Sequence, residues 1–214
     1  MPSDADDDRF SALRTTRMEA FSDGVFAVAI TLLVLEISVP AGSEDDLLRA
    51  VGDQWPSYLA YVVSFATVGA VWLGHSAMTN YLHHVDDLFL RLNLLLLLVV
   101  GFLPFPTRLL AQTIGHDAGG KVAATLYGCS LLAAASLLSV LWSYARRRAL
   151  VQRDAAGHET SVVTRRLTPG LAFYAVMIVL GLFLPVAAVF GYLAIAVFYL
   201  APVHLLRRRS TSVG

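Results

Sequence analysis

Three apolar segments of the chain each carry hydrogen-bonding side chains near one end. The first, RMEAFSDGVFAVAITLLVLEI, begins with a cation, a hydroxyl and a carboxylate, and the next two contribute a histidine and an amide. The side chains are Arg17, Ser22, Asp23, His75 and Asn93. Such groups are costly in hydrocarbon unless they find partners within the protein. A carboxylate with an imidazole is suited to proton relay or metal binding, and the same groups also suit a buried hydrogen-bonded cluster.

Their positions place these side chains at one depth. Asp23 lies about five residues into the first segment, which is roughly 7–8 Å at 1.5 Å per residue. His75 lies near the end of a second segment that runs the opposite way, and Asn93 lies near the start of a third. Ser22 and Trp72 belong to the same layer. We predict a buried cluster that fixes the first segment against the other two, because one carboxylate with one histidine gives thin support to a relay or a metal site.

Other sequence patterns that could support catalysis or metal binding are weak. The run HHVDD, residues 83–87, contains potential metal ligands, but in a loop such a run usually forms a solvated turn. The chain contains no H-E-x-x-H, no G-x-S-x-G and no paired carboxylates at a common depth. We predict no catalytic residue, no metal site and no enzymatic activity.

The composition is that of an integral membrane protein. Of 214 residues, 57% are apolar and 15% are charged, and the mean hydropathy is +0.64. Six segments approach the roughly 20 apolar residues that a membrane-spanning helix needs. They cover about 18–38, 55–79, 88–112, 120–145, 167–184 and 187–206, and Pro185 separates the last two. The single cysteine, Cys129, lies in an apolar run and is expected to pack in the core.

The distribution of charge predicts the topology. Residues 1–16 lack the apolar run of a signal peptide and are predicted to form a loose cytosolic tail, so the first segment is expected to direct insertion. In a six-span topology, thirteen of the sixteen Lys and Arg residues share the side of the N-terminus. The exceptions are Arg49, Arg108 and Lys121. We expect a multi-pass plasma-membrane protein with cytosolic termini, a six-helix domain over 17–207 and a C-terminal tail over 208–214.

One face of the first segment carries apolar side chains and a hydroxyl. Counted at about 100° per residue, this face contains Phe21, Val28, Thr31, Leu32 and Leu35. Asp23 lies about 140° from Val28 and points elsewhere. Ordinary packing explains such a face. The alternative is a narrow pore at an oligomer axis, closed by apolar rings and containing a hydroxyl ring that can coordinate a cation.

The order and spacing of these residues resemble the bacterial members of the transmembrane-protein-175 family of potassium channels. The pattern is R-x-x-x-F-S-D at Arg17, Phe21, Ser22 and Asp23, W-x-x-H at Trp72 and His75, and then Asn93. The resemblance covers about residues 14–112. It implies an all-α integral membrane protein with six transmembrane helices per subunit, assembled as a homotetramer in which the first segment surrounds a central pore. It also implies no TVGYG-type filter, and the sequence contains none.

The resemblance also implies roles for individual residues. Carried over by position, the apolar constriction falls on Val28 and Leu35, with Thr31 one turn from Val28 and Leu32 sharing the lining. The residues expected to form a structural polar network are Arg17, Phe21, Ser22, Asp23, Trp72, His75 and Asn93. Glu36 and the acidic residues 44–46 could concentrate cations at the outer mouth or form a solvated surface.

The function implied by the resemblance is passive conduction of K⁺. The ion would shed part of its hydration shell at the pore rings, and preference over sodium would be modest because few oxygens replace that shell. No cofactor besides the permeant K⁺ is expected. The expected partners are potassium ions, membrane lipid and other copies of the chain, with no nucleic acid.

Two alternatives remain open on the sequence. The first is a proton- or cation-coupled secondary transporter, which typically has carboxylates and broken helices near the bilayer midplane. Asp23 near one face, and Pro104 and Pro106 near the end of the third segment, count against a transporter. The second alternative is a purely structural or assembly role.

Overall fold

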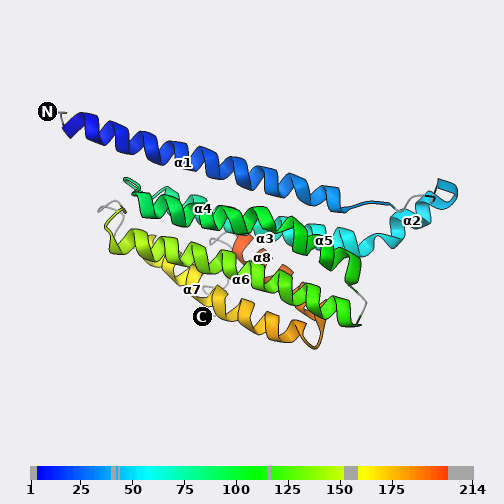
Figure 1. The fold of residues 1–214 in the computed structure, drawn as a ribbon. Helices are drawn as coiled ribbons and strands as arrows, with labels where there is room; N and C mark the ends of the chain where they lie inside the picture. Colours follow the sequence, from blue (N-terminus) through cyan, green and yellow to red (C-terminus); the bar gives the residue numbers. More distant parts are fainter. Residues whose placement is uncertain (1–3, 40–41, 43, 115–116, 152–158, 202–214) are drawn as a thin grey trace, which may run out of the picture.

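The chain folds as an α-helical bundle (Figure 1). The computed structural model describes residues 4–39, 42, 44–114, 117–151 and 159–201. Its helices are α1 (Asp4–Leu33), the short 3₁₀ helices η1 (Val34–Glu36) and η2 (Glu44–Asp46), α2 (Leu47–Asp53), α3 (Trp55–Thr79), α4 (Asp87–Phe102), α5 (Pro104–Thr113), α6 (Asp117–Arg147), α7 (Glu159–Gly181) and α8 (Pro185–Leu200). Within the described residues, one isolated antiparallel bridge joins Leu82 to Val151.

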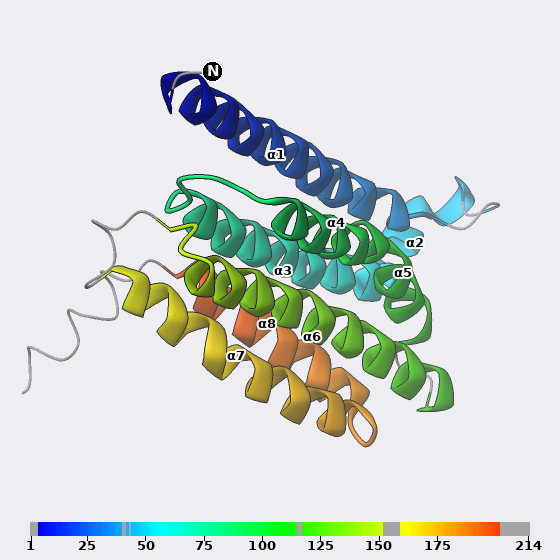
Figure 2. The same ribbon diagram turned by 60° about the vertical axis from the view of Figure 1, so that its left-hand side comes forward.

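The helix α1 lies along one side of the bundle. It packs on α3, α4 and α5, whereas α7 and α8 lie on the far side (Figures 1 and 2). The core between these layers contains large side chains that are at most 1% exposed. They include Phe26, Phe89, Leu96, Tyr127 and Tyr192. This arrangement leaves α1 with helices on one of its faces.

The helices fall close to the predicted segments. Four stretches of the described residues are long and apolar enough to cross a membrane: Leu13–Glu36, Trp55–Thr79, Asp87–Thr113 and Ala118–Arg147. Two shorter apolar helices follow, Gly170–Gly181 and Pro185–Leu200. Residues 202–206, predicted as part of the last segment, and the predicted tail 208–214 lie outside the described residues.

Prolines mark the starts of two helices. The third segment breaks at Leu103, so that Pro104 becomes the first residue of α5, as expected from its missing N–H group. Pro185, predicted to separate the last two segments, is instead the first residue of α8. Leu103 keeps helical backbone angles, so α4 and α5 follow one another with a local interruption, and Asp87–Thr113 forms one potential span.

The start of α1 differs from the prediction of a loose tail. Residues 4–16 belong to the helix α1. The run DADDD at this start is acidic, and acidic residues are favourable in the first turn of a helix. Arg14 also pairs with Asp87 of α4 at 2.5 Å. The extension therefore contacts the bundle at Arg14.

The prediction that Cys129 packs in the core was wrong. Its side chain is exposed, while Gly128 and Ser130 on either side are buried. Consecutive residues of a helix are separated by about 100°, so an apolar helix on the bundle surface exposes some apolar positions.

Candidate functional site

The helix α1 has a buried face and an exposed face. The buried side chains, none more than 6% exposed, recur every three or four residues and are Met18, Ser22, Phe26, Ala29 and Leu33. The predicted pore face of α1 and of the following turn η1 is exposed, with Phe21 at 55%, Val28 at 57%, Leu32 at 41% and Leu35 at 70%. The candidate pore residues therefore lie on the side of α1 that faces away from its own subunit.

Thr31 places a hydroxyl on the exposed face. Its Oγ1 donates to the carbonyl oxygen of Val28, 2.8 Å away. A hydroxyl has one hydrogen and two lone pairs, so this bond leaves the lone pairs of Oγ1 available as acceptors. The apolar face thus contains one oxygen that can coordinate a cation.

Asn93 joins three helices in a buried cluster. Its Nδ2 donates to Ser22 Oγ at 2.9 Å, and its Oδ1 lies 2.8 Å from His75 Nε2. Ser22 Oγ in turn donates to the carbonyl oxygen of Met18 at 2.8 Å. Ser22, His75 and Asn93 are 0%, 1% and 2% exposed. Since Asn93 Oδ1 can only accept, His75 donates through Nε2, and each polar atom of this contact between α1, α3 and α4 has a partner.

Asp23 and Trp72 form a separate contact at the edge of α1. Trp72 Nε1 donates to Asp23 Oδ1 at 2.8 Å. Both residues are exposed, Trp72 by 37%. The structure thus brings Ser22, His75 and Asn93 together in the interior and holds Asp23 beside them at the surface.

Arg17 and Phe21 do not join the buried cluster. Both are exposed, and Phe21 lies on the same face as Val28. The helical periodicity of the sequence had already placed Phe21 on that face, whereas its assignment to the polar network came from the family resemblance.

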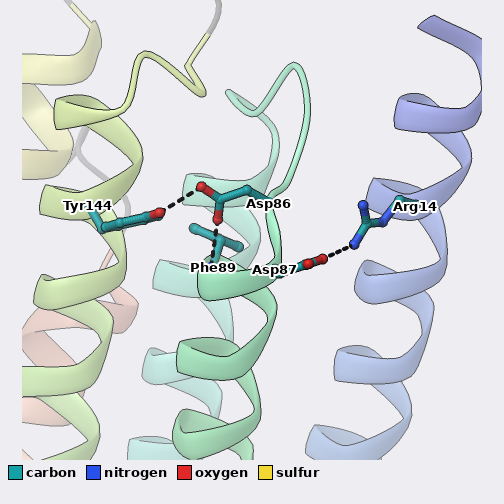
Figure 3. Close-up of polar contacts among 5 residues, drawn as sticks. All are labelled: Arg14, Asp86, Asp87, Phe89 and Tyr144. Atoms are coloured by element: carbon teal, nitrogen blue, oxygen red, sulfur yellow. Dashed lines mark hydrogen bonds and ion pairs between the residues drawn. The ribbon is translucent and has the colours of Figure 1, made fainter. Parts of the chain in front are cut away.

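Two neighbouring carboxylates at the start of α4 contact two other helices (Figure 3). Asp86 Oδ1 accepts from the backbone N–H of Phe89 at 2.8 Å and caps α4. Its Oδ2 accepts from Tyr144 Oη of α6 at 2.6 Å. Asp87 pairs with Arg14 of α1. The HHVDD run thus supplies a cap and two interhelical contacts. An aspartate directly before an apolar helix is a signal that could have predicted the cap.

The Asp86 contacts predict a pH-dependent stability. Partial burial disfavours the charged carboxylate, but the bonds from Tyr144 and Phe89 and the charges of Arg148 and His84 lower the pKa of Asp86 below its ordinary value of 3.8. A carboxylate whose pKa falls on folding stabilises the folded state at every pH above its pKa in the unfolded chain. This stabilisation is lost as the pH falls through its pKa in the folded protein. We expect Asp86→Asn, which keeps a capping oxygen, to lower the free energy of unfolding by about 1 kcal/mol at neutral pH.

Thermal unfolding in detergent at pH 7 and below about pH 3 measures this difference. The difference in stability between the native protein and Asp86→Asn should be smaller at the lower pH. Asp53→Asn, which removes an exposed carboxylate paired with Arg49 at 4.0 Å, is the matched control and should change little at either pH. An equal loss for Asp86→Asn at both pH values would contradict the assignment.

A second buried polar group lies toward the opposite end of the bundle. Ser64 Oγ lies 2.8 Å from Thr107 Oγ1 and 3.0 Å from Tyr127 Oη. The three residues are at most 1% exposed and belong to α3, α5 and α6. The sequence gives little sign of this group, because an isolated hydroxyl in an apolar segment is a weak signal.

Glu36 follows the exposed face of α1 and is paired. Its Oε2 lies 3.6 Å from Nε of Arg108 in α5, and the two side chains are 19% and 61% exposed. From the sequence, this carboxylate was a candidate to concentrate cations at the outer mouth. The adjacent guanidinium offsets most of its field, because opposite charges at this distance largely cancel at longer range.

The chain is similar to several known proteins. The family model described as "Endosomal/lysosomal potassium channel TMEM175" matches residues 17–104. A Streptomyces collinus protein named as a potassium channel is 47% identical over 132 residues, which cover 61% of this chain and 64% of that protein. A Chamaesiphon minutus protein named as a potassium channel is 42% identical over 170 residues, covering 75% of this chain and 82% of that protein.

The fold is similar to a solved structure. The crystal structure of a lysosomal potassium-selective channel TMEM175 homolog from Chamaesiphon minutus superposes with a TM-score of 0.79 at 37% identity. The superposition covers 87% of this chain and 96% of that chain. The similarity therefore includes α6 to α8 as well as the segment matched by the family model.

Proposed function

The chain belongs to the TMEM175 family, and from this premise we propose that it is a potassium-permeable channel that conducts K⁺ passively through a pore lined by α1. The relatives named as potassium channels support the permeant ion. The observation that carries the proposal is the exposed face of α1, on which Val28, Leu32 and Leu35 accompany the hydroxyl of Thr31.

The path for the ion requires several subunits. One α1 helix cannot enclose a pore, whereas a closed ring of four copies would bring their exposed faces together at a common axis. We propose a homotetramer in which Val28, Leu32 and Leu35 form successive apolar rings. The buried contacts of α1 lie on its opposite face, so they would remain intact in such an assembly.

Conduction would follow from the chemistry of these rings. Narrow apolar rings exclude water and hold the pore closed or poorly conducting, while the Thr31 ring offers oxygens to a partly dehydrated ion. We propose no cofactor, because the ion crosses without a chemical step. Preference for potassium over sodium would be modest, since a single hydroxyl ring replaces few water molecules.

The proposed topology has six spans with both termini in the cytosol, in the plasma membrane. The two shorter helices α7 and α8 would complete the six, and the excess of Arg residues on the proposed cytosolic side supports the orientation. In this orientation α1 begins at the cytosolic face and η1 lies at the outer face.

The test is ion flux into liposomes that contain the purified protein. We expect potassium-driven flux from the native chain, and a lower potassium-to-sodium flux ratio from Thr31→Val, which keeps the side-chain shape but removes the oxygen. The matched control is Val179→Ala, which changes an exposed apolar residue of α7 on the far side of the bundle (Figure 1). Absence of flux from a folded native oligomer would refute the channel, and flux that requires an opposing proton gradient would instead indicate a secondary transporter.

A further inference from the structure

We infer that Arg108 is a positioning residue for the outer end of the pore, because its pairing with Glu36 fixes the turn that carries Leu35. The inference rests on the proposed function. It gives α5 a role in conduction that neither the family resemblance nor the composition of α5 indicates.

The last turn before the outer face contains no buried side chain. The helix α1 ends at Leu33 and continues as the 3₁₀ turn η1, which closes with a bond from Ile37 N to Val34 O at 3.1 Å. Leu33 is fully buried and holds the end of α1 by apolar packing. Apolar packing is non-directional, so by itself it leaves the rotation of the following turn poorly fixed.

The pairing of Glu36 with Arg108 fixes the rotation of this turn. Leu35 is 70% exposed, whereas the side chain of its neighbour Glu36 is only 19% exposed and points to Arg108. Turning Glu36 toward α5 turns Leu35 away from α5, toward the proposed axis. The buried Ser22 cluster lies roughly 21 Å away at 1.5 Å per residue, too far to set this rotation alone.

The part of α5 that carries Arg108 is held by buried polar contacts. The neighbouring residue Thr107 is fully buried and lies 2.8 Å from Ser64 Oγ, which in turn lies 3.0 Å from Tyr127 Oη. These contacts tie α5 to α3 and α6. A satisfied buried polar network specifies one arrangement of its helices. Through the Glu36–Arg108 pair, the fixed position of α5 also fixes the position of Leu35 in the proposed ring.

The experiment measures potassium and sodium flux for Glu36→Gln, Arg108→Gln and the exchanged pair Glu36→Arg/Arg108→Glu. A loosened ring is less tightly closed, so we expect both single variants to raise potassium flux roughly two- to fivefold and to lower the potassium-to-sodium ratio. The exchanged pair should return toward the native values. Arg49→Gln, which breaks the exposed pair with Asp53 on the same side of the membrane, is the matched control.

A variant cycle distinguishes positioning from other effects. If Arg108 acts through Leu35, Arg108→Gln should change flux little in a Leu35→Ala background, because the ring is already open. If the two single variants change flux in opposite directions, Glu36 acts as a charge at the mouth and the inference is overturned. Unchanged flux in both also overturns it, while failure of the native protein to conduct refutes the proposed function itself. Thermal unfolding of each variant confirms that it is folded.

Discussion

Replacing Leu35 with alanine should raise the potassium flux of reconstituted protein at least about tenfold, since lowering a barrier by about 1.4 kcal/mol changes a rate tenfold. Leu35 is the most exposed side chain of the apolar face of α1, at 70%. An apolar ring impedes an ion because water leaves it, and a shorter side chain widens the ring and lets water in. Its removal costs the subunit little packing, because the side chain is exposed. Flux should therefore change without a change in unfolding temperature.

The control separates the ring from general loosening of the bundle. Val179→Ala shortens an equally apolar, 58% exposed side chain of α7 and should leave flux and unfolding temperature at native values. A flux for Leu35→Ala equal to that of the native protein would remove Leu35 from the conduction path and reopen the possibility that another face lines the pore.

Replacing Asn93 with alanine should have the largest effect on stability. The substitution leaves the Nε2–H group of His75 without an acceptor in the interior of the bundle and removes the donor to Ser22 Oγ, which keeps its bond to the carbonyl oxygen of Met18. An unsatisfied buried polar group costs about 1–3 kcal/mol, so we expect a loss of about 2–4 kcal/mol in the free energy of unfolding. Thermal unfolding in detergent measures it. Because this cluster is a principal polar contact between α1 and the rest of the subunit, the oligomer should weaken as well.

Ser139→Ala provides the comparison. Ser139 Oγ donates to the carbonyl oxygen of Ala135 in its own helix, so its loss breaks a bond without separating two helices. We expect a loss below about 1 kcal/mol. If Asn93→Ala were no more destabilising than Ser139→Ala, the buried cluster would not be what holds α1 in place.

The sequence was sufficient to predict what depends on helical periodicity. Counting residues along antiparallel segments placed Asp23, His75 and Asn93 at a common depth, with Ser22 in the same layer. The structure joins Ser22, His75 and Asn93 in the interior and leaves Asp23 exposed. The same counting placed Val28 and Leu35 on one face of α1, which is the exposed face. Helical periodicity gives the side of the helix on which a residue lies and its position along the helix axis. Both predictions depend only on these two properties.

Contacts between side chains that are far apart in the sequence were not predictable. The contact of Asp86 with Tyr144 joins residues 58 positions apart, and that of Ser64 with Tyr127 joins residues 63 apart. Neither pair has a distinctive spacing in the sequence. The pairing of Glu36 was not predictable either, because its partner Arg108 lies in a distant segment of the sequence.

The division of α1 into two faces has a consequence for how such a chain can diverge. Side chains on the exposed face contribute little to the folding of the subunit, so in the proposed channel substitutions there would be selected through assembly and transport. Side chains around Ser22 and Phe26 are filtered by folding, whichever ion passes. Related chains can therefore acquire different permeation properties through a few substitutions on the exposed face of α1. The buried contacts that hold α1 in place need not change.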